Sequence, residues 1–285
     1  MTPAGLERRV GEAVATPAGE PLPAHAEATV EELLAALELG DLRAAERDAD
    51  GTWRAVPWVK QGILLAFRVG RMIDMTPAGG ARGAFQFFDK HTVPPLALRL
   101  ESQVRVVPGG STIRRGAYVA PGVVCMPPMY INVGARVGAG TMVDSHALVG
   151  SCAQIGERVH LSAAAQVGGV LEPVNAAPVV VEDDVIVGGN SGVYEGTVVR
   201  RRAVLGAGVV LTRGTPVYDL VRETVYRGSA ERPLEIPEGA VVVPGARRVR
   251  GEWAEGEGLS VQTPVIVKYR DGRTDLATAL EQWLR

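Results

Sequence analysis

The feature of this sequence that most constrains its fold is a run of aliphatic residues at every sixth position. Ten consecutive positions of this kind hold an aliphatic residue or cysteine: Ile113, Val119, Cys125, Ile131, Val137, Val143, Val149, Ile155, Leu161 and Val167. After an insertion bracketed by Pro173 and Pro178, the period resumes at Val181 and continues to Leu211. With about even odds of an apolar residue at each position, ten in a row arise by chance roughly once in a thousand for a chosen register.

A six-residue period is neither the repeat of a helix nor the alternation of a flat strand, but is typical of a short strand plus a corner. One aliphatic side chain per hexad, the anchor, points inward, so three hexads make one triangular coil. Four anchors are followed by glycine, which suits a corner that needs an unusual φ or a close backbone approach. We therefore predict a hexapeptide β-helix. An ordinary β-sandwich is the alternative, but that fold does not predict an apolar residue at every sixth position.

The composition supports a narrow core and buried outer faces. Aromatic residues make up only 5% of the chain, whereas glycines number 35. A core with so few aromatics is built from thin layers of aliphatic side chains. Charged residues are sparse in the repeats between 113 and 167, where they are Arg114, Arg115, Arg136, Asp144, Glu157 and Arg158. We expect that some faces of the prism are covered by other subunits.

The segment before the repeats has a helical pattern. Thr29 and Glu32 form a capping-box motif ahead of an apolar set, which predicts a helix that ends near Gly40. A second helix is predicted to begin at the next residue, Asp41. A third is predicted over residues 57–69, where proline stands at the first position. Residues 74–84 are predicted to form a loop.

The fold class predicted is mainly β, a left-handed parallel β-helix of hexapeptide repeats with an N-terminal α-helical domain and a mixed C-terminal segment. The predicted divisions are the helical domain over 1–100, the β-helix over 101–250 with a loop protruding near 170–178, and the C-terminal segment over 251–285. Within the last part of the chain we expect irregular structure over 214–233, a last coil over 236–245, a polar turn over 251–258, a strand over 263–269 and an amphipathic helix over 275–284.

Charge and cysteine content exclude several classes of function. Lys and Arg number 30 against 32 Asp and Glu, a net charge of −2 without any basic run, so general nucleic-acid binding is not expected. No apolar stretch of about 18 residues exists, and the first residues do not resemble a signal peptide, so we predict no membrane association. Cys125 and Cys152 are too few for a disulfide scaffold, which predicts a soluble, cytoplasmic protein.

Several segments resemble the 2,3,4,5-tetrahydropyridine-2,6-dicarboxylate N-succinyltransferase family of lysine biosynthesis. They read PWVKQGILLAFRV, FFDKHTVPP, RVVPGGSTIRRGAYVAPGVVCMP, GAGTMVDSHALVGSCAQIGERVHLS, GGVLEPVNAAPVVVEDDVIVGG and TPVIVK. The resemblance covers roughly residues 55–285. It implies transfer of succinyl from succinyl-CoA to the amino group of ring-opened tetrahydrodipicolinate, a dicarboxylate, with CoA released. It also implies no permanently bound cofactor, no metal, and a homotrimer with active sites in clefts between neighbouring β-helices.

Two residues are assigned to the substrate by this resemblance. Asp144, in GTMVDSHALVG, directly follows the anchor Val143, so it is expected at a corner that points outward. The resemblance implies that it contacts the substrate amine and acts as base. Arg105, in VRVVPGG, matches the family's substrate-binding arginine, and a guanidinium can bind a carboxylate through two hydrogen bonds. The alternatives are a solvated corner aspartate and a surface ion pair.

The sequence departs from the family pattern after the GGVLEP segment. A segment S-E-V-V-E-G is expected there, whereas the chain reads SGVYEG over residues 191–196. Gly192 thus stands where the first glutamate is expected, and only Glu195 remains. Glu195 is the second catalytic candidate, as a partner of Asp144 or as its replacement. A solvated corner residue is the alternative.

Five residues are candidates for binding the acyl-CoA, which are Gly168, Gly169, Gly189, Arg213 and Lys268. The glycines would let a pantetheine arm approach the backbone closely, or they serve only as coil corners. The two cations are candidate partners of the CoA phosphates, although any exposed cation could take that role.

Three other functions are weighed against succinyl transfer. The sister reaction with acetyl-CoA and a non-catalytic assembly module both remain open. A zinc site like that of β-helical carbonic anhydrases needs three histidines, but the repeats hold only His146 and His160. His160 is expected to be a hydrogen-bonded structural residue, although a histidine base would suit neutral pH. Cys125 is interpreted as a buried hydrophobe, and Cys152 is not expected to act as a nucleophile.

Overall fold

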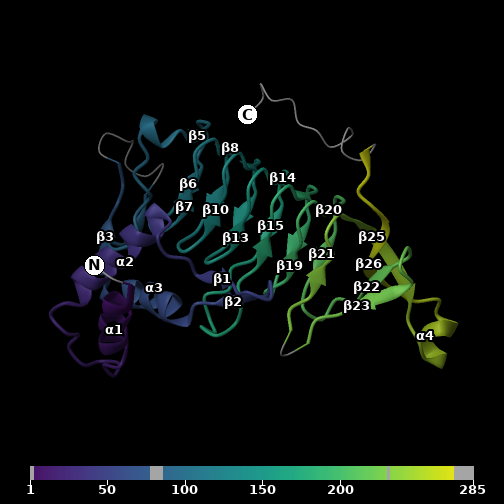
Figure 1. Ribbon diagram of the computed structural model, residues 1–285, viewed down its shortest axis with the longest axis horizontal. Helices are drawn as coiled ribbons and strands as arrows, with labels where there is room; N and C mark the ends of the chain where they lie inside the picture. Colours follow the sequence, from purple (N-terminus) through teal and green to yellow (C-terminus); the bar gives the residue numbers. More distant parts are fainter. Residues whose placement is uncertain (1–2, 78–85, 230–231, 273–285) are drawn as a thin grey trace.

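The computed structural model describes residues 3–77, 86–229 and 232–272, and it confirms the left-handed parallel β-helix (Figure 1). Face A consists of β7 (Tyr118–Val119), β10 (Arg136–Val137), β13 (Gln154–Ile155), β16 (Val180–Val181), β19 (Val198–Val199) and β24 (Glu235–Ile236). Face B begins with β5 (Arg105–Val106), β8 (Val124–Cys125), β11 (Met142–Val143), β14 (His160–Leu161), β17 (Ile186–Val187), β20 (Val204–Leu205) and β25 (Ala240–Arg248). Face C consists of β6 (Thr112–Ile113), β9 (Tyr130–Ile131), β12 (Leu148–Val149), β15 (Gln166–Val167), β18 (Gly192–Val193) and β21 (Val210–Leu211).

The anchors of successive coils stack in register and form the core. Val137 pairs with Ile155, and Ile155 pairs in turn with Val181 across the insertion. Every anchor predicted from the sequence is buried except Val119, which is half-buried and packs against the same core. The residues two positions before the anchors, such as Ala147, complete the core cluster. The core is therefore a column of small aliphatic layers, as the low aromatic content predicts.

The glycines that follow anchors are needed for close backbone approach and not for an unusual φ. A Cβ atom on Gly150 would lie 2.1 Å from the backbone nitrogen of Gly169 in the next coil. Residues with positive φ occupy a different corner position, three before the anchor, where His146 has a φ of 62°. Stacked coils thus leave no room for a side chain directly after these anchors.

The N-terminal helices differ in two details from the sequence prediction. They are α1 (Pro3–Val14), α2 (Ala26–Leu39) and α3 (Pro57–Val69), of which the last two end as predicted. α2 begins three residues before Thr29, which is buried inside the helix, so the capping box is wrong. No helix begins at Asp41. Gly40 turns the chain with a φ of 81°, and the hairpin β1 (Ala45–Arg47) and β2 (Trp53–Ala55) follows.

The helical domain packs on one edge of the prism. Its second hydrophobic core joins Leu34 and Ile63 of the helices to Val133 and Cys152, which lie at corners between faces C and A. β3 (Met72–Asp74), β4 (Phe88–Lys90) and the 3-10 helix η1 (Leu100–Ser102) connect this domain to β5. Most of the loop predicted over 74–84 lies outside the described residues. The domain boundaries at 100 and 250 remain predictions.

The C-terminal part contains more regular structure than predicted. The span 214–233 includes β22 (Val217–Asp219) and β23 (Thr224–Tyr226), which pair with each other and extend face B. The last coil is present at β24 and the start of β25, but β25 continues beyond it as a hairpin with β26 (Ser260–Tyr269). This hairpin contains the strand predicted over 263–269. The expected polar turn includes the short helix α4 (Glu252–Gly256), and the helix predicted over 275–284 lies outside the described residues.

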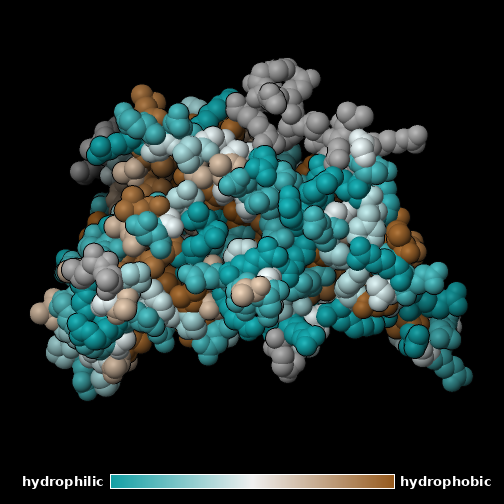
Figure 2. All heavy atoms as spheres, in the orientation of Figure 1, coloured by the Kyte–Doolittle hydropathy of each residue, from teal (hydrophilic) through white to brown (hydrophobic). Residues whose placement is uncertain are grey.

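The surface of the prism is mostly polar. Figure 2 shows hydrophilic side chains over much of the visible face, and apolar side chains gathered over the N-terminal coils. Exposed apolar residues near the first coil include Met72, Phe88 and Leu100. No helix in the part of the chain that the structure describes is long and apolar enough to cross a membrane.

Candidate active site

The predicted site residues lie on two different edges of the prism. The aspartate edge is the corner between faces B and C and carries Asp144 and Gly189, which follow β11 and β17. The loop edge is the corner between faces C and A, where Gly168, Glu195 and Arg213 follow β15, β18 and β21. In a single chain, the structure therefore does not bring the two predicted catalytic carboxylates together.

On the aspartate edge, Asp144 is at an outward-facing corner beside a histidine. The anchor Val143 is fully buried, whereas the Asp144 side chain is 29% exposed. One carboxylate oxygen, Oδ1, accepts a hydrogen bond from the backbone N–H of Ser145 at 2.7 Å. The other, Oδ2, lies 3.8 Å from Nε2 of His160, which is on the neighbouring strand. Asp144 thus has one oxygen held in place and one next to a group that can carry a proton.

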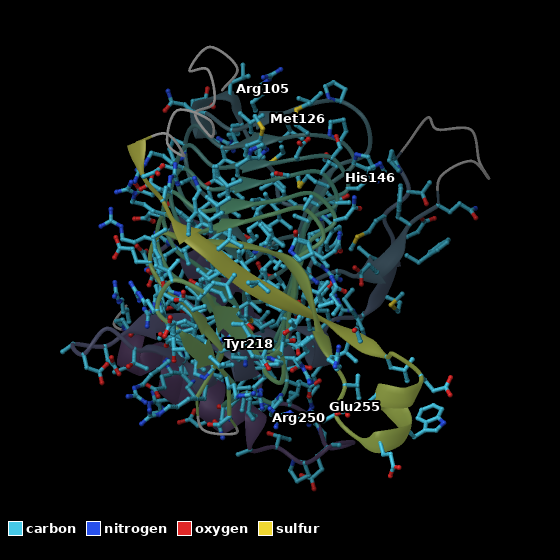
Figure 3. All side chains as sticks on the ribbon, turned by 90° about the vertical axis from the view of Figure 1, so that its right-hand side faces the viewer. Arg105, Met126, His146, Tyr218, Arg250 and Glu255 are labelled. Carbon is cyan, nitrogen blue, oxygen red and sulfur yellow. The ribbon has the colours of Figure 1, made fainter. Side chains whose placement is uncertain are left out.

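Arg105 lies on the same side of the prism as Asp144. It is exposed on β5 and pairs with Val124, which pairs in turn with Met142, so Arg105 is two coils away from β11. Figure 3 shows Arg105, Met126 and His146 along one border of the molecule. Arg105, the predicted cation for a substrate carboxylate, therefore lies on face B. Asp144, the predicted base for the substrate amine, lies at the edge of the same face.

On the loop edge, four predicted residues line one open pocket of about 640 Å³. They are Gly168, Gly169, Glu195 and Arg213. Glu195 is exposed, and its Oε2 accepts a hydrogen bond from the backbone N–H of Arg213 at 3.1 Å. Glu195 therefore fixes the turn that carries Arg213. Lys268 is not among the lining residues, and its Nζ lies 3.9 Å from Asp271 on another part of the molecule's surface.

Tyr194, which was not predicted as a site residue, also lines this pocket. A Cβ atom on Gly192 would lie 2.3 Å from the Tyr194 ring and 2.8 Å from its phenol oxygen. The ring also covers Gly168, where a Cβ would be 2.7 Å away. The tyrosine thus fills the space that a glutamate at position 192 would need. The sequence does hold one signal for the role of Tyr194. It is an aromatic residue that directly follows an anchor in repeats that are poor in aromatic residues.

A buried lysine of the helical domain holds the loop that walls this pocket. Lys60 of α3 is 0% exposed, and its Nζ donates to the carbonyl oxygens of Pro173 at 3.0 Å and Ala176 at 2.8 Å. Both acceptors lie in the insertion between β15 and β16 and line the pocket. Burial lowers the pKa of Lys60, and no carboxylate among the described residues pairs with it. No local pattern in the sequence indicates this contact, because the partners are more than a hundred residues apart.

The two cysteines are unsuited to nucleophilic chemistry. Cys125 and Cys152 are both fully buried. Burial raises the pKa of each thiol to about 12, so neither is a thiolate at neutral pH. Within the described residues, no group of three His, Cys, Asp or Glu side chains is placed to hold a metal ion.

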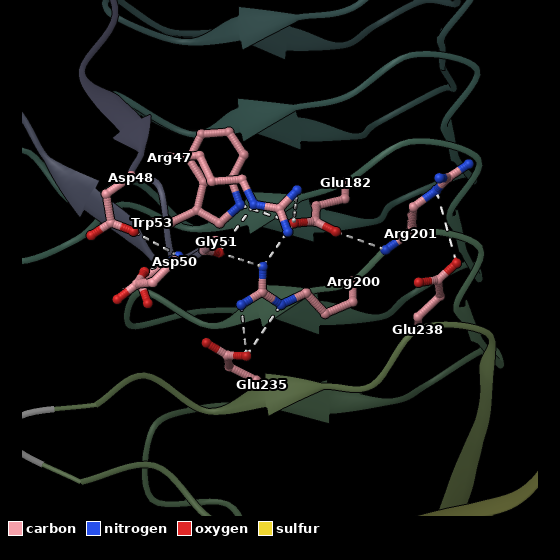
Figure 4. Close-up of polar contacts among 11 residues, drawn as sticks. Arg47, Asp48, Asp50, Gly51, Trp53, Glu182, Arg200, Arg201, Glu235 and Glu238 are labelled. Carbon is pink, nitrogen blue, oxygen red and sulfur yellow. Dashed lines mark hydrogen bonds and ion pairs between the residues drawn. The ribbon is translucent and has the colours of Figure 1, made fainter.

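A polar network fastens the β1–β2 hairpin to face A beside the loop edge (Figure 4). Nε1 of Trp53 donates to Glu182 at 3.0 Å, and Glu182 also accepts from Nη1 of Arg200 at 2.9 Å and from the backbone N–H of Arg201 at 3.0 Å. Burial alone would raise the pKa of Glu182, but these three hydrogen bonds outweigh it and hold the pKa below its usual value. Trp53 also lines a second pocket that shares Glu195 and Arg213 with the first.

Comparisons with known proteins identify the family of the chain and support its fold. A family model described as "Tetrahydrodipicolinate N-succinyltransferase N-terminal" matches residues 12–69, and one described as "Hexapeptide repeat of succinyl-transferase" matches residues 178–213. A crystal structure from Campylobacter jejuni, assigned to the 2,3,4,5-tetrahydropyridine-2-carboxylate N-succinyltransferases, has a TM-score of 0.51 at 16% identity. It covers 86% of this chain and 63% of that chain, and it supports the fold alone.

Curated relatives are similar along most of the chain. The 2,3,4,5-tetrahydropyridine-2,6-dicarboxylate N-succinyltransferase of Bradyrhizobium diazoefficiens is 42% identical over 263 residues, which are 90% of this chain and 89% of the relative. The protein of the same name from Polynucleobacter asymbioticus is 40% identical over 274 residues, covering 93% and 92%. At this identity and coverage, the chain belongs to the tetrahydrodipicolinate N-succinyltransferase family of hexapeptide-repeat transferases.

Proposed function

We propose that this chain transfers the succinyl group of succinyl-CoA to the amino group of ring-opened tetrahydrodipicolinate where the aspartate edge of one protomer faces the loop edge of another. The reaction is the family's step in diaminopimelate and lysine biosynthesis. The observation that carries the proposed site is the division of its residues. Arg105 on face B and Asp144 at the neighbouring edge lie on one side of the prism, while Gly168, Glu195 and Arg213 lie on the loop edge.

A homotrimer is the assembly that we propose for bringing these edges together. Each protomer is a three-sided prism, and three prisms around a threefold axis can place unlike edges opposite each other at every contact. The outward positions of faces B and C next to the aspartate edge hold half-buried apolar side chains, including Met142, Ile186, Tyr130 and Leu148. Burying such side chains between protomers favours association. The cytoplasmic location predicted from the cysteine content is part of the same proposal.

The aspartate edge would bind and deprotonate the acceptor substrate. The guanidinium of Arg105 holds a carboxylate of the substrate, and Asp144 accepts a proton from its amine as the nitrogen attacks the thioester carbon. A carbon–nitrogen bond forms, the carbon–sulfur bond breaks, and CoA leaves as a thiol after taking up a proton. Nε2 of His160, 3.8 Å from Oδ2 of Asp144, orients that carboxylate. Neither a covalent enzyme intermediate nor a metal is needed for this step.

The loop edge would bind the acyl donor. Gly168 and Gly169 have no side chains to keep a pantetheine arm away from the backbone. The phenol of Tyr194 stands at the place of the missing glutamate and donates a hydrogen bond to the thioester oxygen as negative charge develops on it. The carboxylate of Glu195 already accepts a hydrogen bond from the backbone N–H of Arg213. We therefore assign the role of base to Asp144 alone.

One assay tests the acyl-group preference and the activity together. The purified chain is supplied with tetrahydrodipicolinate and either succinyl-CoA or acetyl-CoA, and the release of free thiol is measured. We expect turnover with succinyl-CoA to exceed that with acetyl-CoA. Faster turnover with acetyl-CoA would identify the sister reaction, and no turnover with either donor would favour a non-catalytic assembly module. Light scattering on the same sample checks the trimer.

A further inference from the structure

A pocket on the third edge of the prism takes no part in the function proposed above. The third edge is the corner between faces A and B, where Gly156 and Glu182 follow β13 and β16. The hairpin pocket, of about 270 Å³, lies between this edge and the β1–β2 hairpin. Figure 4 shows Arg47 and Trp53 of the hairpin next to Glu182, and Arg201 on the same edge as Glu182. The charged and aromatic residues that line the pocket are Arg43, Arg47, Trp53, Glu182, Asp183 and Arg201.

The wall that face A gives to this pocket contains a buried amide oxygen without a donor. Gln154 precedes the anchor Ile155, so its side chain points out of face A, where it lines the hairpin pocket and is 2% exposed. Its Nε2 donates to the backbone carbonyl oxygen of Cys152 at 3.0 Å, which fixes the orientation of the amide. Its Oε1 accepts no hydrogen bond from any residue that the structure describes. Because buried acceptors are normally satisfied, Oε1 lacks a donor that a molecule in the pocket can supply.

The same pocket contains a cation with an unused donor. Nε of Arg43 is buried, and within the described ranges it has no hydrogen-bond acceptor. Burial lowers the pKa of Arg43, and the neighbouring positive charge of Arg136 lowers it further. Arg136, on the strand that pairs with Gln154, likewise has a buried Nη1 for which the described residues provide no acceptor. Two like charges with unused donors are stabilised by an anion placed beside them.

The charge and size of the pocket narrow the class of ligand. Its described lining has three arginines against two acids, which leaves an excess of one positive charge. Glu182 already accepts from Trp53 and Arg200, so Asp183 is the acid that can meet a cationic group. A ligand with two carboxylates and one ammonium group therefore neutralises the lining. A volume of 270 Å³ equals that of about nine waters and suits a molecule of about ten non-hydrogen atoms.

We infer that the hairpin pocket binds a free acidic amino acid. Its ammonium group donates to Oε1 of Gln154 and lies near Asp183, while its carboxylates accept hydrogen bonds from Arg43 and the other arginines of the lining. The hairpin pocket is separate from the aspartate edge and the loop edge, so the inference goes beyond succinyl transfer and does not depend on it.

Calorimetric titration of the purified chain with three probes tests the class of ligand. L-glutamate has an ammonium group and two carboxylates, glutarate lacks the ammonium group, and 4-aminobutyrate lacks the α-carboxylate. We expect L-glutamate to bind with a Kd on the order of 0.1 mM. The other two probes should bind about 10-fold more weakly, because each leaves a buried group of the pocket without a partner.

Two variants assign the groups of the ligand to their partners. In Gln154→Met the amide is replaced by an apolar side chain of similar length, and L-glutamate should bind about 10-fold more weakly while glutarate binds as before. In Arg43→Met both probes should bind about 10-fold more weakly. Arg43→Lys keeps the charge and should recover part of this affinity, which separates loss of the cation from misfolding. Arg54→Met alters an exposed arginine of the same hairpin that does not line this pocket, and it is the matched control with wild-type affinity.

Three results would overturn the inference. The first is that the wild-type chain does not bind L-glutamate. The second is an equal affinity for L-glutamate in the wild type, Gln154→Met and Arg43→Met. The third is a loss of binding in Arg105→Met but not in Arg43→Met, which would place the amino acid at the proposed substrate site. Because the titration contains no acyl donor, a failure of succinyl transfer leaves its result unaffected.

Discussion

The aspartate edge and the loop edge belong to the same repeat but are built in different ways. On the aspartate edge the hexads are regular, and Asp144 is positioned by its own backbone and by His160 on the next coil. The loop edge interrupts the repeat with an insertion and is covered by the helical domain, whose Lys60 holds that insertion. The repeat alone is therefore enough to present an acid, whereas the pocket on the loop edge needs structure from outside the repeat.

Replacing the acid on each edge by its amide should give the largest difference between the two edges. In Asp144→Asn we expect kcat to fall about 100-fold or more, because the amide cannot accept the proton of the amine. The proposed trimer should persist, since the side chain is part-exposed and points away from the core. Glu195→Gln is the matched control and should change kcat by less than about 3-fold, because the amide oxygen still accepts the N–H of Arg213. Steady-state kinetics and light scattering check both variants, and an equal loss in the two would make Glu195 a second base.

Removing one hydroxyl group tests the role of the loop edge in the chemical step. In Tyr194→Phe the ring still fills the space over Gly192, so the fold is unchanged. We expect kcat to fall about 10- to 100-fold, because the proposed hydrogen-bond donor to the thioester oxygen is lost. The KM for succinyl-CoA should change little. A kcat equal to that of the wild type would limit Tyr194 to packing.

Lys60 tests whether the helical domain acts on the site through the insertion. In Lys60→Met the carbonyl oxygens of Pro173 and Ala176 lose their donor. We expect the KM for succinyl-CoA to rise about 10-fold, with a loss of about 1–3 kcal/mol in the free energy of unfolding. The KM for tetrahydrodipicolinate, which we propose binds at the aspartate edge, should stay the same. A rise in both KM values would show that the lysine supports the whole protein and not one edge. Lys268→Met, which alters an exposed lysine, is the control.

Acid should weaken the attachment of the β1–β2 hairpin. The pKa of Glu182 is lower in the folded chain than in the unfolded chain, so its carboxylate adds stability above the unfolded pKa of about 4.5. That contribution is lost as the pH falls through the lowered folded value. We expect Glu182→Gln to reduce the free energy of unfolding by about 1 kcal/mol at pH 7 and by less at pH 3. Urea denaturation at the two pH values measures this, and an equal reduction at both would contradict the charged role.

The coils could be predicted from the sequence because each hexad repeats one local rule. The period places Val143 inside and Asp144 outside without reference to any distant residue. Lys60 and Tyr194 could not be predicted in the same way. Lys60 contacts a loop far along the chain, and Tyr194 matters because it covers Gly192 and Gly168. The capping box at Thr29 failed because tertiary burial of that residue outweighed a local motif.

The stacking of coils has a consequence for how such a protein can change its length. A deletion of one residue within the regular hexads would turn the next anchor outward, so outside loops the repeat can grow or shrink only by whole turns, each adding about 4.8 Å along the axis. The spacing along the axis between residues of one edge, such as Asp144 and Gly189, thus changes only in steps of one turn.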